Sequence, residues 1–456
     1  MNSMMPSNEV IAVLGAGESG VAAAKLLAAE GRAVCVLDSG ASNALKVRVA
    51  ELEKFGIPVR TGEDALRDPA GYALAVLSPG IDPQTPLVQG FVNSGVEIAG
   101  ELEMAYERCQ CPVVAITGTN GKTTTTQLVD AMFNGAGVPS VASGNIGPAF
   151  SAKVRESASL GVMTVEVSSF QLETIRTFRP KISVWLNFSP DHLDRYRTLE
   201  EYRNAKLRIF ENQTGEDFAV VNARDPLPAL AARRIDFSAY GSGADFELHE
   251  EVIHFHGRAV LAMADTQLRG LHNAENLMAA LGVGHAWGLS WEQMRNALCR
   301  YRALPHRCEV VGRMDGVEYV NDSKATNLDA LEKALHSEKR KVVLIAGGKD
   351  KGFEFETVTE LVASKCRAAV LIGEMSERIE SFWARALPCY RATSLADSVS
   401  RARALASPGD VVLFSPGTSS FDMFQSYADR GNQFRALVQA LASAQSTDGS
   451  VAPPRE

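Results

Sequence analysis

The stretch Val113–Thr126, VVAITGTNGKTTTT, decides the fold of the middle of the chain. An apolar run suited to a β-strand ends in a turn with two glycines, and apolar residues at helical spacing follow. A strand, a glycine-rich turn and a helix N-terminus in this order predict a phosphate-binding loop, because backbone N–H groups and the helix end can face the anion. Lys122 would reach the outer phosphates, and Thr123 is placed to contact the magnesium ion that accompanies a nucleotide.

The loop G-T-N-G-K-T-T is one residue shorter between its glycines than the usual G-x-x-x-x-G-K-[ST] pattern. The alternative interpretation is a Gly/Thr-rich turn that binds nothing, and the flanking strand and helix argue against it. The predicted nucleotide-binding residues of the loop are Gly118, Thr119, Asn120, Gly121, Lys122, Thr123 and Thr124.

The length of 456 residues is too great for one hydrophobic core and suggests about three domains. A hydrophobic content of 46% and a charged content of 22% are typical of a globular protein. The formal net charge of −8 argues against a general nucleic-acid binder. No apolar run approaches the roughly 20 residues that span a bilayer, and the N-terminus lacks a signal-peptide pattern. The sequence therefore predicts a cytoplasmic protein without membrane insertion.

Seven cysteines are scattered along the chain without a C-x-x-C pair. Cys109 and Cys111 flank a single residue, but no histidine or second cysteine pair completes a zinc site. Reduced structural thiols are therefore the favoured interpretation of these cysteines.

The first segment reads as a βαβ unit. The apolar run Val10–Leu14 is followed by the G-x-G-x-x-G spacing of Gly15–Gly20, a helical pattern, and a second apolar run that ends before Asp38. This is the pattern of a dinucleotide fingerprint, in which phosphate approaches the glycine backbone and a ribose hydroxyl meets the acidic residue. The pattern alone is weak, and it leaves a nicotinamide-dependent oxidoreductase open as one function of the chain.

Two apolar runs in the middle segment bring polar residues that could take part in chemistry. The run Leu160–Val167 contains Glu166, whose carboxylate is costly to bury unless it is paired or binds a metal ion. A magnesium ligand and a satisfied core pair both remain open for this residue. The run Ile182–Phe188 is followed by His192, which taken alone is better interpreted as a structural histidine. An amphipathic helix is predicted over Leu199–Glu211.

A third region of alternating strands and helices fills the rest of the chain. Polar or glycine-rich loops follow its predicted strands, and strand ends of this kind bind ligands in open α/β sheets. The last helix is predicted over Phe421–Ala444, and the polar tail Gln445–Glu456 is predicted to be disordered. The strands are predicted at Val317–Val320, Lys341–Ala346, Ala368–Ile372 and Asp410–Phe414.

Six motifs, in this order, resemble those of the Mur ligases of peptidoglycan synthesis. They are G-T-N-G-K-T-T at 118–124, S-G-N-I-G at 143–147, E-V-S-S-F-Q-L-E at 166–173, D-H-L-D-R-Y at 191–196, L-P-H-R at 304–307 and N-D-S-K-A-T-N at 321–327. The resemblance implies an α/β fold of three domains. These are a Rossmann-like UDP-binding domain over 1–102, a central P-loop ATPase domain with a mostly parallel sheet over 103–305, and a C-terminal Rossmann-like domain over 306–456.

The resemblance also implies roles for particular residues. UDP-N-acetylmuramoyl-L-alanine, rather than NAD, would bind at Gly17, Glu18, Ser19, Asp38, Ser39, Ser78, Gly80 and Asn145. ATP would bind at the phosphate loop and at Asn273, Asn276, Arg307 and Asp322. Two magnesium ions would be held by Thr123, Glu166, His192 and Lys206. D-glutamate would be bound by Lys324, Thr326, Lys351, Ser420 and Phe421.

The implied activity is ATP-dependent ligation of D-glutamate to UDP-N-acetylmuramoyl-L-alanine through an acyl phosphate. The S-S-F-Q-L-E and G-T-N-G-K forms resemble the family member with this substrate choice. The catalytic residues would be Lys122, Lys206 and His192, with Lys206 carbamylated so that it serves as an anionic metal ligand. Without the resemblance, Lys206 is better interpreted as a surface lysine on a solvated helix face. The protein is expected to be a monomer.

Three other functions remain as alternatives. The oxidoreductase named above leaves the phosphate loop unexplained. A P-loop switch or transporter ATPase leaves the C-terminal region without a role, and the N-K-x-D signature of guanine recognition is absent from the sequence. A folate polyglutamate ligase shares the reaction type but not a UDP-binding first domain.

Overall fold

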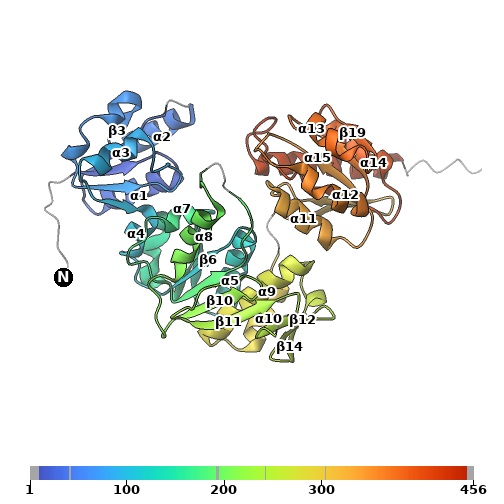
Figure 1. Ribbon diagram of the computed structural model, residues 1–456, viewed down its shortest axis with the longest axis horizontal. Helices are drawn as coiled ribbons and strands as arrows, with labels where there is room; N and C mark the ends of the chain where they lie inside the picture. Colours follow the sequence, from blue (N-terminus) through green and yellow to red (C-terminus); the bar gives the residue numbers. More distant parts are fainter. Residues whose placement is uncertain (1–9, 41–42, 192–194, 242, 303–304, 449–456) are drawn as a thin grey trace, which may run out of the picture. The chain divides into compact units, whose positions relative to one another are not determined.

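The computed structural model describes residues 10–40, 43–191, 195–241, 243–302 and 305–448 (Figure 1). Its contacts divide the chain into two compact units. The larger unit comprises Met1–Thr266 and Ala274–Tyr301, and the smaller unit comprises Gln267–Asn273 and Arg302–Glu456. Within the described residues, two β-sheets belong to the larger unit and one belongs to the smaller. The domain boundaries that the resemblance implies stay a prediction.

The N-terminal sheet has five parallel strands in the order β3-β2-β1-β4-β5. Alternate residues of β1 enter two different hydrophobic clusters, Ile11 and Val13 on one face and Ala12 and Leu14 on the other. Both faces are therefore buried, which is why the strand reads as a continuous apolar run. The elements are β1 Ile11–Leu14, α1 Glu18–Ala29, β2 Val34–Asp38, α2 Asn43–Lys54, β3 Val59–Thr61, β4 Leu74–Leu77, α3 Pro86–Asn93, β5 Ile98–Gly100 and α4 Glu101–Tyr106.

The middle sheet has nine strands in the order β14-β13-β12-β11-β10-β9-β6-β8-β7. Its strands run parallel except where β13 pairs with β12 and β14. β6 lies between β9 and β8, so the phosphate loop that follows it is at the C-terminal edge of a central strand. The strands are β6 Val113–Thr117, β7 Ser140–Gly144, β8 Val162–Glu166, β9 Ile182–Trp185, β10 Phe218–Asn222, β11 Arg233–Ser238, β12 Phe246–His249, β13 Val252–Phe255 and β14 Arg258–Ala262.

Six helices accompany the strands of the middle sheet among the described residues. The phosphate loop leads directly into α5, whose apolar residues Leu128, Val129, Met132 and Phe133 are fully buried. This apolar stripe holds the helix against the sheet and fixes where its N-terminus points. The helices are α5 Lys122–Gly135, α6 Phe150–Lys153, α7 Ser169–Leu172, α8 Leu199–Leu207, α9 Leu271–Trp287 and α10 Trp291–Arg300.

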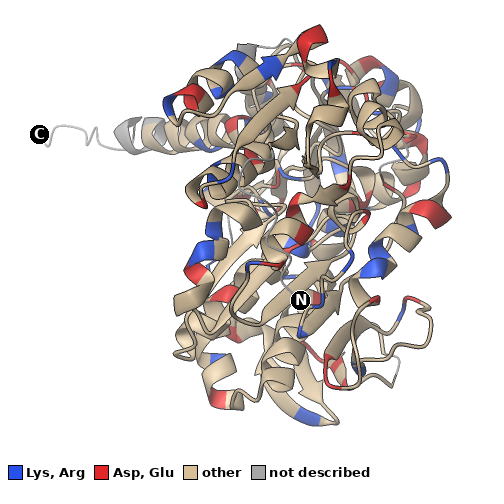
Figure 2. Cartoon of the chain, turned by 90° about the vertical axis from the view of Figure 1, so that its left-hand side faces the viewer, with Lys and Arg blue, Asp and Glu red and all other residues tan. Residues whose placement is uncertain are grey.

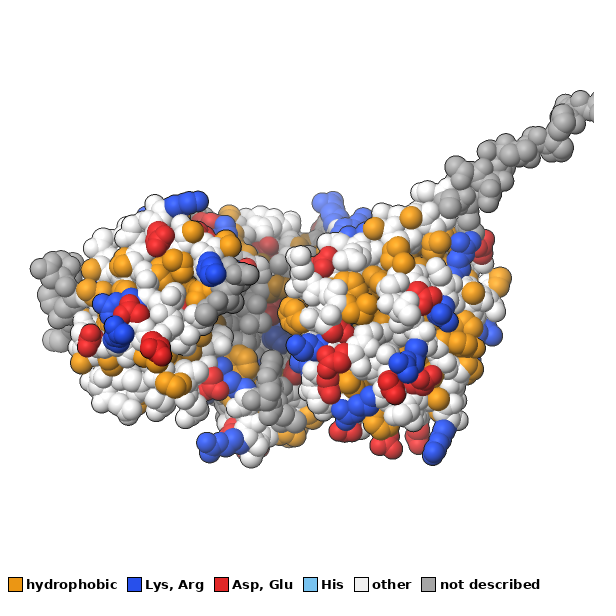
Figure 3. All heavy atoms as spheres, turned by 90° about the horizontal axis from the view of Figure 1, so that it is seen from above, with side chains coloured by type: hydrophobic (Ala, Val, Ile, Leu, Met, Phe, Trp, Pro, Cys, Tyr) orange, Lys and Arg blue, Asp and Glu red, His pale blue; other side chains and the backbone are white. Residues whose placement is uncertain are grey.

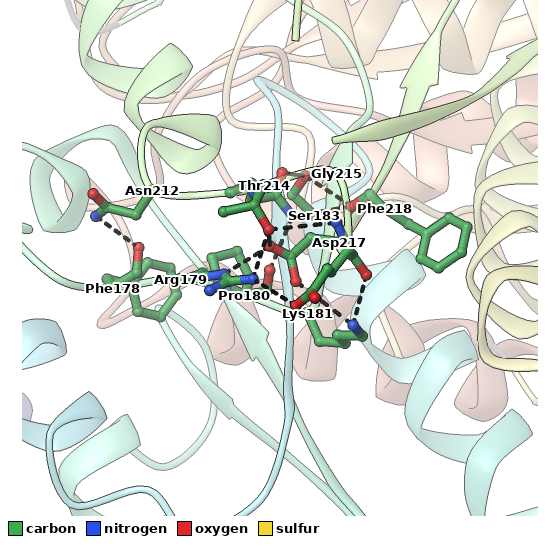
Figure 4. A network of polar contacts seen from close by, with 12 residues as sticks. Phe178, Arg179, Pro180, Lys181, Ser183, Asn212, Thr214, Gly215, Asp217 and Phe218 are labelled. Atoms are coloured by element: carbon green, nitrogen blue, oxygen red, sulfur yellow. Dashed lines mark hydrogen bonds and ion pairs between the residues drawn. The ribbon is translucent and has the colours of Figure 1, made fainter. Parts of the chain in front are cut away.

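A polar network around Asp217 joins the N-terminal ends of β9 and β10 (Figure 4). The Asp217 carboxylate, 3% exposed, accepts hydrogen bonds from Arg179 Nε at 2.7 Å and from the Thr214 N–H at 2.9 Å. Gln213 accepts a hydrogen bond from Ser183 Oγ at 2.8 Å and donates to two backbone carbonyls. The buried polar side chains at this edge of the sheet thus have partners within the chain.

The C-terminal sheet has six strands in the order β15-β16-β20-β17-β18-β19, all parallel except β15. Its strands are β15 Glu309–Met314, β16 Val317–Asn321, β17 Val342–Ala346, β18 Cys366–Leu371, β19 Cys389–Arg391 and β20 Val411–Phe414. Its helices are α11 Leu328–Ser337, α12 Thr359–Lys365, α13 Ser376–Trp383, α14 Leu395–Leu405 and α15 Tyr427–Asp448. The predicted α/β class with mostly parallel sheets is confirmed.

Three predicted element boundaries are wrong. The last helix begins at Tyr427 rather than Phe421, because the segment before it forms turns that carry Ser420. The same helix continues to Asp448, so the predicted disordered tail does not begin at Gln445. The predicted helix over Leu199–Glu211 ends at Leu207 and tightens into a 3₁₀ turn. Several short strands were not predicted from the sequence, including those of the β12–β14 meander, where apolar alternation is weak.

On the face seen in Figure 3, charged side chains of both signs are interspersed, and Figure 2 shows that residues of both signs are distributed along the ribbon. Among the described residues, no helix is both long enough and apolar enough to cross a membrane.

Candidate active site

The phosphate loop joins Thr117, the last residue of β6, to Lys122, the first residue of α5. Gly118 and Gly121 have φ angles of 154° and 84°, a region that residues with a Cβ rarely adopt. A Cβ on Gly121 would also collide with Oδ1 of Asn276. No side chain caps the N-terminus of α5, as expected for a helix end that receives a phosphate.

Asn187 holds the loop in this shape. Its side-chain Oδ1 accepts the Asn120 N–H at 2.9 Å, and its Nδ2 donates to the Asn120 carbonyl at 2.9 Å. Its backbone carbonyl accepts the Thr119 N–H at 2.9 Å. The Thr119 hydroxyl in turn donates to the Ser189 carbonyl at 3.1 Å. The segment that directly follows β9 therefore fixes the conformation of the phosphate loop in the absence of a ligand.

Lys122 folds back over the loop that precedes it. Its Nζ donates to the carbonyls of Gly118 at 2.9 Å and Thr119 at 2.8 Å. The ammonium group is thus held by two carbonyls of the loop, which a bound phosphate would replace as its partner.

Lys206 projects from α8 into the same place. It is 1% exposed, and its Nζ donates to the Gly118 carbonyl at 2.9 Å and lies 4.7 Å from the centre of the Tyr202 ring. Burial lowers the pKa of Lys206 well below its ordinary value, and the charge of Lys122 lowers it further, while Asp191 and Glu166 oppose the shift. The interpretation of Lys206 as a surface lysine is wrong.

Glu166, the last residue of β8, is 2% exposed. Its Oε1 accepts a hydrogen bond from Asn145 Nδ2 at 2.9 Å, and its Oε2 is buried without a hydrogen-bond partner among the described residues. A buried carboxylate oxygen left in this state is destabilising unless a ligand completes it. A fully satisfied core pair, one of the two interpretations left open, is therefore wrong.

The two asparagines of α9 that were predicted to bind ATP belong to different compact units, Asn276 to the larger and Asn273 to the smaller. The Asn276 side chain accepts a hydrogen bond from Thr125 Oγ1 at 3.2 Å, which ties α9 to the first turn of α5. Asn273 falls in the smaller unit, where its Nδ2 donates to the Arg269 carbonyl at 2.9 Å.

The predicted UDP-binding residues of the first sheet follow the C-terminal ends of β1, β2 and β4. α1 begins after Gly17 without a side-chain cap. The Asp38 carboxylate accepts two backbone N–H groups: its Oδ2 accepts the Ala16 N–H at 2.8 Å and its Oδ1 accepts the Gly40 N–H at 2.9 Å. It ties the β1 and β2 loops together. Ser78 is buried beside Gly15, while Ser39 and Gly80 are exposed.

The S-S-F-Q-L-E segment connects the phosphate-loop domain to the first sheet. Ser168 and Gln171 form a capping box at the start of α7. Glu173 forms an ion pair with Arg195 at 2.9 Å and accepts a hydrogen bond from the Tyr196 hydroxyl at 2.5 Å. This arrangement anchors the residues that follow His192, which itself lies outside the described residues, so its predicted roles stay a prediction.

Within the smaller unit, Asp322 lies at the C-terminal end of β16. Its carboxylate accepts hydrogen bonds from the Cys308 N–H at 3.2 Å and from Ser415 Oγ at 2.8 Å. Burial raises the pKa of Asp322 to about 6, although these hydrogen bonds and the charge of Arg307 oppose the shift. The carboxylate is thus ionised only above mildly acidic pH.

Arg430 links two loops that carry predicted D-glutamate residues. It is 1% exposed, and its guanidinium donates to Ser323 Oγ at 3.0 Å, to the Ser323 carbonyl at 2.8 Å and to the Thr418 carbonyl at 3.2 Å. Lys324 and Ser420 lie one and two residues from these contacts. Burial lowers the pKa of Arg430 to about 10, so it stays charged at neutral pH.

The predicted D-glutamate residues differ in exposure. The Lys324 ammonium lies 3.8 Å from the centre of the Tyr427 ring, and Ser420 is 2% exposed. Thr326 is half-buried. Lys351 and Phe421 are exposed, and Phe421 is among the most exposed large apolar side chains of the described chain.

Sequence reasoning missed Asn187, Arg430 and His306. Asn187 directly follows an apolar strand on the loop side, a position that could have identified it. His306 is buried against Gly431 and its Nδ1 lies 3.0 Å from Asn321 Nδ2. Nothing in the local sequence marks a buried arginine such as Arg430.

Family models match three parts of the chain. The model described as Mur ligase MurD-like, N-terminal domain matches residues 9–100. The Mur ligase middle domain matches residues 116–284, and the Mur ligase, glutamate ligase domain matches residues 306–418.

Curated relatives are similar over nearly the whole chain. A UDP-N-acetylmuramoylalanine–D-glutamate ligase of Geobacter metallireducens is 41% identical over 449 residues, covering 96% of this chain and 98% of the relative. The proteins of the same name from Geotalea daltonii and Koribacter versatilis are 40% and 39% identical, each covering 95% of this chain and 97% of the relative.

Solved structures share the fold at lower identity. A UDP-N-acetylmuramate–alanine ligase from Thermotoga maritima has a TM-score of 0.61 at 18% identity, covering 95% of this chain and all of that one. A MurF ligase from the same organism, in complex with ADP, has a TM-score of 0.60 at 17% identity, covering 84% of this chain and 91% of that one. Together with the family models and the curated relatives, these likenesses show that the chain belongs to the Mur ligase family, among relatives named UDP-N-acetylmuramoylalanine–D-glutamate ligase.

Proposed function

We propose that this chain is an ATP-dependent ligase that joins the amine of D-glutamate to the L-alanyl carboxylate of UDP-N-acetylmuramoyl-L-alanine, giving ADP and phosphate. The relatives that cover nearly the whole chain carry the name of this activity. The observation that carries the proposal is the cluster of Lys122, Glu166 and Lys206 around the phosphate loop, where two lysine nitrogens converge on the Gly118 carbonyl.

The chemistry explains why cations must gather at the phosphate loop. A carboxylate resists attack by an amine because oxide is a poor leaving group, so phosphoryl transfer from ATP first converts it to an acyl phosphate. Both reactants are anions, and their repulsion is offset only by positive charge. Lys122 would hold the transferring phosphate from its position over the loop, and the N-terminus of α5 would add its partial positive charge.

The residues present fit magnesium ions. Glu166 offers a buried oxygen without a hydrogen-bond partner among the described residues. Thr123 is the second residue of α5, directly after the lysine, as a metal-contacting threonine is in phosphate loops. Magnesium would neutralise phosphate charge there. His192 is proposed as a further ligand.

Lys206 is proposed to be carbamylated. A protonated ammonium beside Lys122 and metal ions would be unfavourable, and its lowered pKa favours the neutral amine, which reacts with carbon dioxide. The carbamate oxygens would give the site a second anionic ligand beside Glu166.

The smaller unit is proposed to supply D-glutamate. Lys324, Thr326 and Ser420 would bind its two carboxylates, with Lys351 and Phe421 at the rim, and Asp322 and Arg307 would contact ATP. Arg430 would hold the loops that carry Lys324 and Ser420 in register, as a positioning residue. Asn145, Ser78 and the start of α1 would bind the UDP-sugar.

The oxidoreductase is the weaker candidate. Asp38 does not decide between the two functions, because each of its carboxylate oxygens accepts one backbone N–H and can still accept a ribose hydroxyl. The cluster of Lys122, Glu166 and Lys206 around the phosphate loop, however, would have no role in hydride transfer.

The proposal is tested by phosphate release from ATP in the presence of UDP-N-acetylmuramoyl-L-alanine and one amino acid. Release is expected with D-glutamate and not with L-glutamate or L-alanine. Lys122→Ala should lose turnover about 10²–10³-fold while it still binds the UDP substrate, because the lost cation acts on the transferring phosphate. Release that does not depend on the amino acid, or comparable turnover in the variant, would contradict the proposal.

A further inference from the structure

A pair of cysteines lies in the segment between α4 and β6, where the chain leaves the first sheet for the middle one. Cys109 and Cys111 are both partly exposed, and both are free thiols. Cys109 Sγ donates to the Cys111 carbonyl at 3.3 Å, so the Cys109 side chain lies over the residue two positions ahead. It also lies 4.0 Å from the buried Met163 Sδ. The Cys109 side chain thus lies against the Cys111 backbone, and the two cysteine side chains are also within hydrogen-bonding reach of each other.

The surroundings stabilise Cys109 as a thiolate. The Cys111 thiol and N–H can donate hydrogen bonds to the Cys109 sulfur. Hydrogen bonding from the Cys111 thiol, against the opposing effect of burial, lowers the pKa of Cys109 to about 7. The same contact raises the pKa of Cys111, which keeps its proton. Cys109 is thus the more nucleophilic thiol of the pair, and Cys111 is a protonated thiol next to it.

Cys109, unlike Cys111, also lines an open surface cavity of about 540 Å³. The cavity is bordered by Leu26 of α1 and by Glu30, which directly follows that helix. Its other lining residues are Glu107, Arg108 and Gln110 of the linker, and Val154 and Arg155. Arg108 forms an ion pair with Glu30 at 2.8 Å. The lining contains charged groups of both signs, so a small polar molecule can approach the Cys109 sulfur through this cavity.

The other cysteines lack this combination. Cys35 and Cys366 are buried, and burial raises the pKa of Cys366 to about 12. Burial also raises the pKa of Cys299, and that of Cys389 to about 11, although both are partly exposed. Cys308 has a pKa well above its ordinary value because of burial and Asp322.

We propose that Cys109 and Cys111 form a redox modification site, in which Cys109 reacts with a low-molecular-weight disulfide and Cys111 resolves the product. The Cys109 thiolate attacks one sulfur of R–S–S–R, forming a Cys109–S–S–R mixed disulfide and releasing one RS⁻. The Cys111 thiol then displaces the second R–S group as RSH, and a Cys109–Cys111 disulfide remains. The two protein thiols are oxidised and the disulfide is reduced to two thiols.

The disulfide closes a ring around Gln110 alone, within the linker. Such a short ring departs from relaxed disulfide geometry, so thiols should reverse it readily. The site is independent of the proposed ligase activity.

The test uses the reduced full-length protein and oxidised glutathione at pH 7, quenched by alkylation and followed by peptide mass spectrometry. Cleavage after Arg108 and Lys122 places both cysteines on one peptide, and fragmentation at Gln110 separates them. Cys109 should react about tenfold faster than Cys299 or Cys389, since a larger thiolate fraction is only partly offset by lower nucleophilicity. The product should lose two hydrogens.

Two variants separate the roles of the thiols. Cys111→Ser should stop at the glutathione mixed disulfide on Cys109, and Cys109→Ser should yield neither product on this peptide. The alkylation rate of wild-type Cys109 against pH, with Cys389 as the internal control, needs no variant. Equal rates for Cys109, Cys299 and Cys389, or an unchanged product in Cys109→Ser, would overturn the proposal.

Discussion

Buried polar groups differ between the two edges of the middle sheet, which are formed by the N-terminal and the C-terminal ends of its parallel strands. At the N-terminal ends of β9 and β10, the Asp217 carboxylate has partners from Arg179 and Thr214 (Figure 4). At the C-terminal ends of β6 and β8, Glu166 keeps an oxygen without a hydrogen-bond partner among the described residues, and the Lys206 nitrogen is buried beside another lysine. The first edge is complete without a ligand, and the second is not.

The difference indicates which edge serves stability and which serves function. A satisfied network contributes to the free energy of folding, whereas an unpartnered buried carboxylate lowers it until a ligand binds. Both edges are built by the same parallel strands, so fold alone does not distinguish them. The difference predicts that substitutions at the two edges will have opposite effects on stability and activity.

The largest effect is expected for Lys206→Ala. Turnover should fall about 10³-fold or more, because the proposed carbamate is lost from a site that neutralises phosphate charge. A short carboxylic acid added to the assay should restore part of the activity by filling the space left by the side chain. Lys181→Ala, at the opposite edge and partly exposed, is the matched control and should keep turnover within about twofold. Normal activity in Lys206→Ala would show that the two edges do not differ as described.

Glu166→Gln separates activity from stability. The amide replaces a buried carboxylate of which one oxygen has no hydrogen-bond partner among the described residues, so the free energy of unfolding should stay unchanged or rise by about 1 kcal/mol. Turnover should fall about 100-fold because the proposed metal ligand is weakened. Urea unfolding and phosphate release measure the two effects. A loss of stability with full activity would mean that Glu166, like Asp217, contributes to stability rather than to activity.

Asp217→Ala should behave in the reverse manner. Loss of the hydrogen bonds from Arg179 and Thr214 should lower the free energy of unfolding by about 2 kcal/mol. Turnover measured well below the unfolding temperature should stay within about twofold. A fall in turnover without a loss of stability would contradict the separation of the two edges.

The smallest effect is expected for the pH dependence of the contribution that Asp217 makes to the free energy of unfolding. Burial raises the pKa of Asp217, but hydrogen bonds from Arg179 and Thr214 outweigh it, and the folded-state pKa is lowered. A lowered pKa means that the stabilisation is present above the unfolded value of about 3.9 and disappears as pH falls through the folded value. The stability difference between wild type and Asp217→Ala should therefore be constant near neutral pH and shrink below about pH 4. A difference that grows on acidification would exclude this origin.

The residues of the candidate site could be predicted from sequence patterns in different degrees of detail. The phosphate loop was accessible because glycines and Lys122 occupy positions fixed by strand and helix, and the structure places them at the end of β6. Glu166 could be located on its strand, but its unpaired oxygen depends on what Asn145 contacts across the sheet. The burial of Lys206 could not be derived from helix periodicity, since it results from packing of α8 onto the phosphate loop.

The prediction failed where distant segments decide the outcome. The backbone N–H contacts of Asp38 to neighbouring loops were not predicted from the sequence, and its role in substrate binding stays a prediction. Arg430 has its partners 107 and 12 residues away, and no local pattern reveals such contacts. The short strands of the β12–β14 meander depend on pairing with each other rather than on strong apolar alternation.

Ligand-induced stabilisation tests the contrast between the two edges most directly. Thermal unfolding of wild type, Glu166→Gln and Asp217→Ala is compared with and without a magnesium complex of a non-hydrolysable ATP analogue. At about 100 times its Kd, the ligand should stabilise wild type and Asp217→Ala equally, by about 2.7 kcal/mol. The stabilisation should be largely absent in Glu166→Gln. Equal stabilisation of all three proteins, or none in the wild type, would contradict the account.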